Sequence, residues 1–282
     1  MTSGPSAKGP SAKHSIMGGH SPTLMLFAFG YLFFLYAPLM MLPLFAFNDS
    51  SFIAFPLTGF TTKWFEQALS DEDMLHALSS SVQVALIAAT AATTLGLLAA
   101  KAITRYAFRG RSAVTGFIML PLFVPEIMLG IALLIILNTV GVPLGLTAVT
   151  LAHVILCTPF AISVLISRME GFDKSLEEAS LDLGEGPWMT FWRVTFPLVM
   201  PGIVSSFLLC FIVSFDDFLI AFFVTGTEQT LPVFIWSQLR FPAKLPGVLA
   251  MGVLILAASI VLVVIAEWVR RIGVDDKPQP GV

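Results

Sequence analysis

Six long runs of apolar residues, separated by short polar segments, dominate the hydrophobic pattern of this chain. Each run is near the roughly 20 residues that a helix needs to cross the hydrocarbon core of a membrane. Backbone N–H and C=O groups find no water there, so such runs are expected to be helical. The pattern predicts an all-α membrane protein with about six transmembrane helices. The runs extend over residues 24–47, 82–100, 113–137, 146–166, 198–224 and 248–269.

Composition agrees with this prediction, because 56% of the 282 residues are apolar and only 12% are charged. Soluble domains carry about 25% charged residues. Residues 1–23 repeat a Gly-Pro-Ser-Ala-Lys unit and contain too few apolar residues for a core, so they are expected to form a disordered tail. A single transmembrane domain is expected over residues 24–273, followed by a short tail over 274–282. The first run is too long for a signal peptide and is expected to stay as an anchor.

Lys and Arg are distributed unevenly among the loops. With the N-terminus placed in the cytoplasm, twelve of the fifteen Lys and Arg residues fall in cytoplasmic segments. Lys63, Arg240 and Lys244 are the three that fall on the other side. The bias predicts that both termini and the polar segment at 173–197 are cytoplasmic.

Several chemistries find no support in the sequence. Cys157 and Cys210 lie in different predicted spans, and the four histidines form no ligand-spaced cluster, so neither a metal site nor a disulfide is expected. The chain has no G-x-x-x-x-G-K-[ST] loop to hold nucleotide phosphates. We therefore expect a chain that is not an enzyme, binds no cofactor and binds no nucleic acid, and any ATP it uses must be hydrolysed by another subunit.

An ordered polar hairpin is predicted at residues 173–197, between the fourth and fifth runs. Asp173 or Ser175 can cap a short helix, and Gly184 suits the left-handed residue that ends it. Pro187 can begin a second short helix, so that two helices at an angle form a compact unit. The alternative is a loop that packs its aromatic residues at the level of the lipid headgroups. One face of the first helix carries Leu176, Ala179 and Leu183.

The hairpin also carries a motif. Glu178-Ala179-Ser180, three residues, Gly184, nine residues and then Val194-x-Phe196-Pro197 resemble the E-A-A-x3-G-x9-I-x-L-P signature of binding-protein-dependent ABC importer permeases. Three positions depart modestly from it: Ser180, Val194 and Phe196. The resemblance implies a type I ABC importer transmembrane domain whose hairpin docks on an ATPase subunit. The residues that it assigns to this coupling are Glu177, Glu178, Ala179, Ser180, Gly184 and Pro197.

Other stretches resemble the second permease subunit of putrescine and spermidine importers. They are 36–38, 151–153 with Cys157, 181–184, 214–217, 223–226 and 231–232. The resemblance implies a polyamine permease of the bacterial inner membrane, multi-pass and surrounded by lipid. The partners that it implies are a second homologous permease, two ATP-binding subunits that bind ATP and magnesium, and a periplasmic polyamine-binding protein.

Three acidic residues lie inside predicted spans: Glu126 in the third, and Asp216 and Asp217 in the fifth. A carboxylate near the middle of a membrane costs roughly 2.5–3.5 kcal/mol, so each is expected to have a partner or a function. Acidic groups at one depth, in spans that lack Lys and Arg, suit a pathway for a dication or trication. On a continuous fifth helix, the face with Asp217 is the smaller and more polar, so Asp217 is placed first.

Other interpretations stay open. The three carboxylates can instead cap broken helices or bond to the partner permease. His153, in the fourth span, is expected to be a buried neutral histidine bonded to a neighbour, with proton coupling as the alternative. The substrate can also be an inorganic ion or an organophosphonate. A different class is an ion-coupled secondary transporter that uses the same acids as relays, although that class leaves the hairpin unexplained.

An external segment at residues 61–81 carries apolar residues on a partly helical pattern that is interrupted by Asp71-Glu72-Asp73. The two interpretations are a contact with a solute-binding protein and a helix that lies on the membrane surface.

Overall fold

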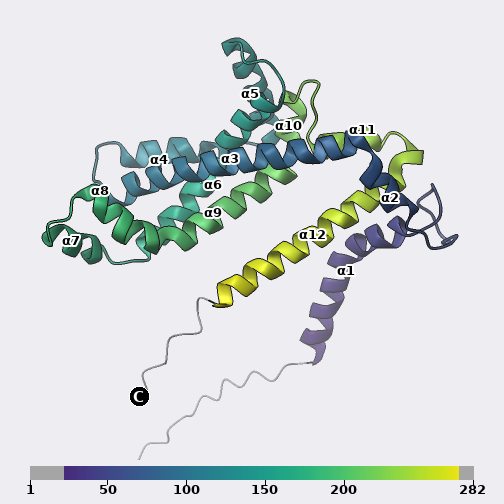
Figure 1. Cartoon of the computed structure of the whole chain (residues 1–282), viewed down its shortest axis with the longest axis horizontal. Coiled ribbons are helices and arrows are strands. Elements are labelled where there is room, and N and C mark those ends of the chain that lie inside the picture. The colour runs from purple at the N-terminus through teal and green to yellow at the C-terminus, as the bar shows by residue number, and fades with distance from the viewer. Residues whose placement is uncertain (1–21, 273–282) are drawn as a thin grey trace, which may run out of the picture.

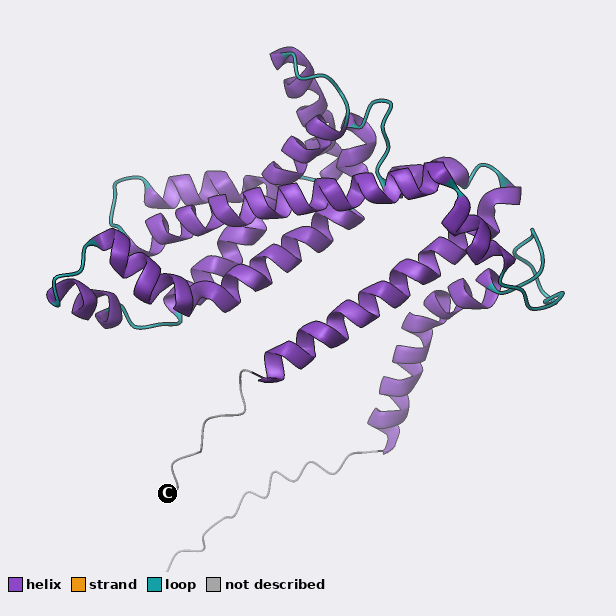
Figure 2. Ribbon diagram, in the orientation of Figure 1, coloured by secondary structure: helices purple, strands orange, loops and turns teal. Residues whose placement is uncertain are grey.

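The computed structural model describes residues 22–272, with side chains described over residues 24–261. The prediction of a disordered tail over 1–23 therefore lies almost wholly outside the described residues, and that of a tail over 274–282 lies wholly outside them. Figure 2 shows helices joined by loops in the described part of the chain. An isolated β-bridge joins Asn48 and Phe60. The predicted all-α architecture is confirmed.

Three long helices form the central bundle: α3 (Glu72–Arg105), α6 (Leu146–Glu170) and α9 (Phe196–Asp216) (Figure 1). Small residues let these helices approach closely, as they do in membrane proteins generally. A Cβ added to Gly96 of α3 would lie 2.7 Å from the Cβ of Ala161 on α6. α3 is longer than the predicted second span because Asp71 caps it, accepting a 3.0 Å hydrogen bond from the Met74 N–H. The acidic cluster at 71–73 thus begins a helix instead of interrupting one.

A second unit joins α1 (Pro22–Ala46), α2 (Lys63–Ser70), α11 (Leu231–Gln238) and α12 (Leu245–Ile272) to the far end of α3 (Figure 1). Trp64 and Ala68 of α2 are buried with Met74, Leu231 and Val248. The segment at 61–81 is therefore packed into the protein on one side, and neither sequence-based interpretation of it had included this packing.

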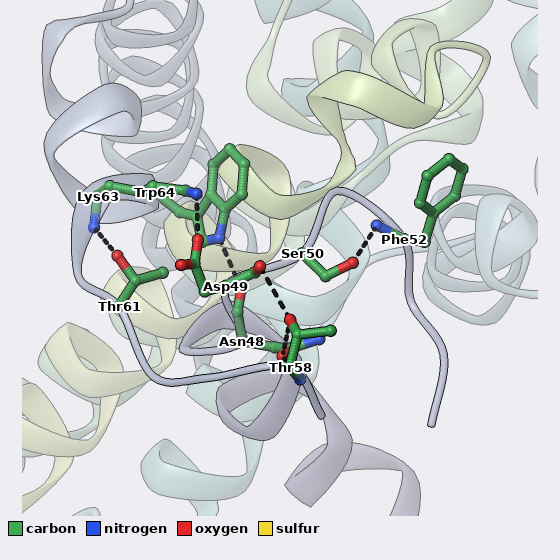
Figure 3. Close-up of polar contacts among 8 residues, drawn as sticks. All are labelled: Asn48, Asp49, Ser50, Phe52, Thr58, Thr61, Lys63 and Trp64. Carbon is green, nitrogen blue, oxygen red and sulfur yellow. Dashed lines mark hydrogen bonds and ion pairs between the residues drawn. The ribbon is translucent and has the colours of Figure 1, made fainter. Parts of the chain in front are cut away.

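The loop between α1 and α2 is held by polar contacts around Asn48 (Figure 3). The Trp64 indole N–H donates a 2.8 Å bond to the Asn48 backbone oxygen, and the Thr58 N–H donates a 3.0 Å bond to the Asn48 side-chain oxygen. Lys63 pairs with Asp49 in the same loop. These contacts fix the position of the end of α1 relative to the start of α2.

The predicted third span is not one straight helix. α4 (Arg111–Met119) passes through a 3₁₀ turn at Leu120–Leu122, and α5 (Glu126–Val140) then leaves at 104° to it. Pro121 and Pro125 explain the break, because proline removes a backbone donor and excludes the preceding residue from the helical region. Among the described residues, five helices are long and apolar enough to cross a membrane, and this bent pair would make a sixth.

The predicted fifth span is also interrupted. α9 ends at Asp216, and α10 (Leu219–Val224) follows after a break at Asp217, whose backbone is extended at ψ 122°. The expectation of one continuous helix over 198–224, which set the relative directions of Asp216 and Asp217, is wrong. α5 and α10 pack together and project from the central bundle (Figure 1).

Candidate coupling and transport sites

The hairpin at 173–197 begins as predicted. α7 (Ser175–Asp182) follows Asp173, whose side chain accepts a 3.0 Å bond from the Ser175 backbone N–H. This bond stabilises the ionised carboxylate and lowers the pKa of Asp173 below its ordinary value. Gly184 ends the helix at φ 91°, a left-handed conformation that glycine adopts without strain. Pro187 begins α8 (Pro187–Thr190).

The second helix of the hairpin is not a separate element. α8 continues through a π-helical turn at Phe191–Thr195 directly into α9, so that helix runs unbroken from Pro187 to Asp216. In the π turn the Phe196 N–H bonds to the Phe191 oxygen, five residues back. The predicted pair of short helices is therefore one short helix, α7, attached to a long one. Pro197 lies near the start of α9, exposed.

One surface of the hairpin is exposed and largely apolar. Glu178, Ala179 and Gly184 are all exposed, as is Leu183, which keeps 86% of its area accessible. Trp188 of α8 is 71% exposed. Isolated exposed leucines are ordinary, but Leu183 at the end of α7 and Trp188 of α8 are two large exposed apolar side chains in one short segment, which makes this segment a candidate interaction surface. We call these five residues the docking surface.

Two of the predicted coupling residues point into their own chain. The Glu177 carboxylate accepts a 2.9 Å bond from Arg105 Nε and a 2.7 Å bond from Thr195 Oγ1. Ser180 shares a 3.0 Å hydrogen bond with Thr190 of α8. The motif therefore divides between residues that face outward and residues that hold α7 against the rest of the protein.

A buried polar cluster forms where α9 breaks. Both ring nitrogens of His153, which is fully buried on α6, are bonded: Nδ1 to Ser214 Oγ at 2.7 Å and Nε2 to Asp217 Oδ2 at 3.1 Å. The same Asp217 oxygen accepts a 2.9 Å bond from the Ala221 N–H. Asp217 thus caps α10 with a side-chain acceptor that replaces the missing backbone acceptor. The prediction of a buried His153 bonded to a neighbour is confirmed.

The preference for Asp217 as a pathway residue rested on the smaller and more polar face of the predicted fifth helix. This face is buried against α3 and α6, and Asp217 itself is only 8% exposed. Small polar residues there serve helix packing. Asp216 and Glu126 are exposed, and they remain predicted pathway residues. The buried face carries Ser206, Cys210, Ser214, Asp217 and Ala221.

Glu126 and Asp216 lie at the same end of the pair formed by α5 and α10. Gly130 of α5 lies against Ile220 and Phe223 of α10, and the turn after α5 lies against the end of α10, where Gly145 N bonds Val224 O at 3.1 Å. The two helices therefore run in the same direction. Glu126 begins α5 and Asp216 precedes α10, so both exposed carboxylates belong to the starting end of this pair.

Sequence reasoning missed the partners of Glu177, namely Arg105 and Thr195. Arg105 ends a long helix and had been counted only as a cytoplasmic charge. No local signal in the sequence pairs Glu177 with Arg105, because the two residues lie 72 positions apart. Cys157 and Cys210 are buried opposite each other as free thiols, each donating a weak 3.5 Å bond to the other's backbone oxygen.

Two relatives cover most of this chain. The putrescine transport system permease protein PotI of Escherichia coli strain K12 is 38% identical over 233 residues, which are 80% of this chain and 82% of PotI. The spermidine/putrescine transport system permease protein PotC of the same strain is 34% identical over 239 residues, which are 84% of this chain and 90% of PotC.

Solved structures share the fold. A bacterial ABC transporter that imports the acidic polysaccharide alginate has a chain that matches with a TM-score of 0.68 at 14% identity, over 88% of this chain and 95% of that one. A bacterial alginate ABC transporter in complex with an alginate pentasaccharide-bound periplasmic protein matches with the same TM-score of 0.68, at 17% identity over 89% of this chain and 93% of that one. Residues 92–272, from the middle of α3 to the end of α12, match one family throughout. With this match, the two permease relatives and the shared helical fold, the chain belongs to the family of binding-protein-dependent transport system inner membrane components.

Proposed function

We propose that this chain is one permease subunit of an ATP-driven, receptor-dependent importer of polyamines of the putrescine and spermidine type. The observation that carries the substrate class is the 38% identity to a putrescine permease over 80% of the chain. The chain provides one side of the translocation pathway and does no covalent chemistry on the substrate.

The exposed carboxylates support a cationic substrate. Asp216 and Glu126 belong to α9 and α5, and neither helix contains a Lys or Arg that would neutralise them. A polyammonium ion loses hydration when it enters a membrane, and carboxylates replace part of that hydration. In this proposal Asp216 and Glu126 contact the substrate, whereas Asp217 positions α10 beside them.

The permease relatives and the exposed surfaces support the proposed partners. The docking surface receives one of two ATP-binding subunits, which hold ATP and magnesium, so no ATPase site is needed in this chain. A second homologous permease completes the pathway across the exposed face of α5, and a periplasmic polyamine-binding protein delivers the substrate. The chain spans the inner membrane with both termini and α7 in the cytoplasm, in keeping with its Lys and Arg bias.

Transport in this proposal proceeds by alternating access. Closure of the ATP-bound subunits moves α7 of this chain and the corresponding helix of the second permease toward each other. This movement favours the conformation that opens outward to the receptor. Hydrolysis and release return the complex to the inward-open conformation, in which water reaches the carboxylates and competes for the bound ammonium groups.

Receptor-dependent ATP hydrolysis by the reconstituted complex tests this function. Putrescine and spermidine should stimulate hydrolysis, whereas sulfate, phosphate and a phosphonate at the same concentration should not. Stimulation by anions alone would refute the cationic substrate and leave the importer class intact. Failure of the chain to assemble with any ATPase subunit would refute the importer class.

A further inference from the structure

Glu177 connects three elements at the end of the molecule that carries the docking surface. Its Oε2 accepts the 2.9 Å bond from Arg105, the last residue of α3, and its Oε1 accepts the 2.7 Å bond from Thr195. Glu177 itself lies in the first turn of α7. Both carboxylate oxygens are therefore engaged within the chain.

The contact is enclosed by the protein. The Arg105 side chain is 8% exposed and the Glu177 side chain 16%, in contrast to ordinary surface pairs, which are solvated and weak. The Arg105 guanidinium also stacks 4.5 Å from the centre of the Phe172 ring, and Lys101 lies 4.2 Å from that of Phe191. These contacts hold the carboxylate in one position, so a displacement of α7 must displace its partners.

The two partners of Glu177, Arg105 and Thr195, lie at the ends of their elements. Thr195 is buried, and it is the last residue of the π turn through which α8 passes into α9. π turns occur often at functional sites. Arg105 thus ends α3, and Thr195 directly precedes α9, which ends at Asp216.

We propose that Glu177 is a positioning residue that transmits the movement of α7 to α3 and α9, and that it does not contact the ATPase subunit. This inference rests on the proposed importer function. The inference gives Glu177 a different role from Glu178, the next residue of α7, whose side chain is exposed. The docking surface binds the ATPase. The contacts of Glu177 with Arg105 and Thr195, which we call the Glu177 junction, transmit the movement to the transmembrane helices.

The experiment compares variants of the full reconstituted complex in two measurements: copurification of the ATPase subunit, and the ratio of receptor-stimulated to basal ATP hydrolysis. Glu177→Gln should retain the ATPase subunit and lower the stimulation ratio by about tenfold, because a charged hydrogen-bonded contact is lost. Arg105→Gln should do the same, and the double variant should be no worse than either single variant because all three lose the same ion pair between Arg105 and Glu177.

A matched control lies in the same hairpin. Glu185 pairs with Arg193 on the exposed side, so Glu185→Gln should leave both measurements unchanged. Thr195 offers a second, milder pair of variants: Thr195→Ser keeps the hydroxyl that donates to Glu177, whereas Thr195→Val removes it at similar volume. Only Thr195→Val should lower the stimulation ratio.

Four outcomes would overturn the proposal in whole or in part. Loss of the ATPase subunit from the Glu177→Gln complex would mean that Glu177 contacts it, and an unchanged stimulation ratio would mean that the junction transmits nothing. Equal ratios for Thr195→Val and Thr195→Ser would exclude the route into α9. If only anions stimulate the wild-type complex, the polyamine assignment fails while the same variants still decide the junction. A wild type that no solute stimulates would overturn both.

Discussion

At the scale of single residues, two neighbouring carboxylates have different surroundings. Asp217 lies in the break after α9, where its side chain accepts from the Ala221 N–H and bonds His153. Asp216, the last residue of α9, is exposed and has no such bonds recorded within the described chain. A buried, bonded carboxylate braces the fold, and an exposed one in an apolar span is free to meet a cation.

Substituting each aspartate separates these roles. Asp216→Asn should lower polyamine uptake into vesicles about tenfold, because one charged contact to an ammonium group is lost, while the melting temperature of the complex stays unchanged. Asp217→Asn should instead destabilise the protein by about 1.5–3 kcal/mol, because the hydrogen bond between the Asp217 carboxylate and His153 is lost. The reverse pattern, with uptake lost only in a thermally unaltered Asp217→Asn variant, would return Asp217 to the pathway.

At the scale of elements, the helices are positioned by close contacts and by breaks. α3 and α6 cross where Gly96 meets Ala161, and an added Cβ at Gly96 would also lie 3.1 Å from the Ala161 backbone carbon. Backbone cannot move aside as a flexible side chain can, so this crossing has no room for a larger residue.

The close contact at Gly96 predicts that replacing this glycine with alanine destabilises the protein, which is the opposite of the usual effect of this substitution in a helix. Alanine normally favours a helix over glycine by about 0.8–1 kcal/mol, and Gly116→Ala in α4, where nothing lies within 4 Å of the new Cβ, should be neutral or stabilising. Gly96→Ala should destabilise the bundle by about 1–3 kcal/mol. Melting temperatures of the two purified variants in detergent test this difference, and equal shifts would contradict the packing argument.

The docking surface predicts an assembly defect without unfolding. Leu183 is 86% exposed, so Leu183→Asp should cost this chain little stability by itself. If the docking surface binds the ATPase subunit as proposed, the new charge is buried in the interface without a counter-charge, which is expensive, so copurification of the ATPase subunit should fall at least tenfold. Normal retention of the ATPase by a folded Leu183→Asp variant would place the interface elsewhere.

At the scale of the whole molecule, α7 and the loop between α1 and α2 lie at opposite ends of the structure (Figure 1). The Lys and Arg bias predicts that the α7 end is cytoplasmic. Exposed Ser175 and Ser51 mark the two ends, and the two native thiols are buried.

Labelling from one side of the membrane tests this orientation. In a chain with both native cysteines replaced by alanine, a membrane-impermeant maleimide added to intact cells should label Ser51→Cys after outer-membrane permeabilisation. It should reach Ser175→Cys only after the inner membrane is also opened. Labelling of both positions from the same side would overturn the orientation and the proposed coupling together.

The sequence by itself determined the class of this protein. Six apolar runs dictated a helical membrane protein because hydrocarbon allows few other structures, and Pro187 and Gly184 marked helix ends through backbone constraints that are local. The motif at 178–184 was recognised by its resemblance to the signature of binding-protein-dependent ABC importer permeases, and local spacing alone did not reveal it.

Only the tertiary structure decided which polar residues face outward. The break at Asp217, the burial of the polar face of α9 and the inward direction of Glu177 depend on partners distant in the chain, namely His153, Arg105 and Thr195. Helical periodicity says which residues share a face, but it cannot say whether that face meets another helix or an open pathway, because contacts between helices are not encoded in local spacing.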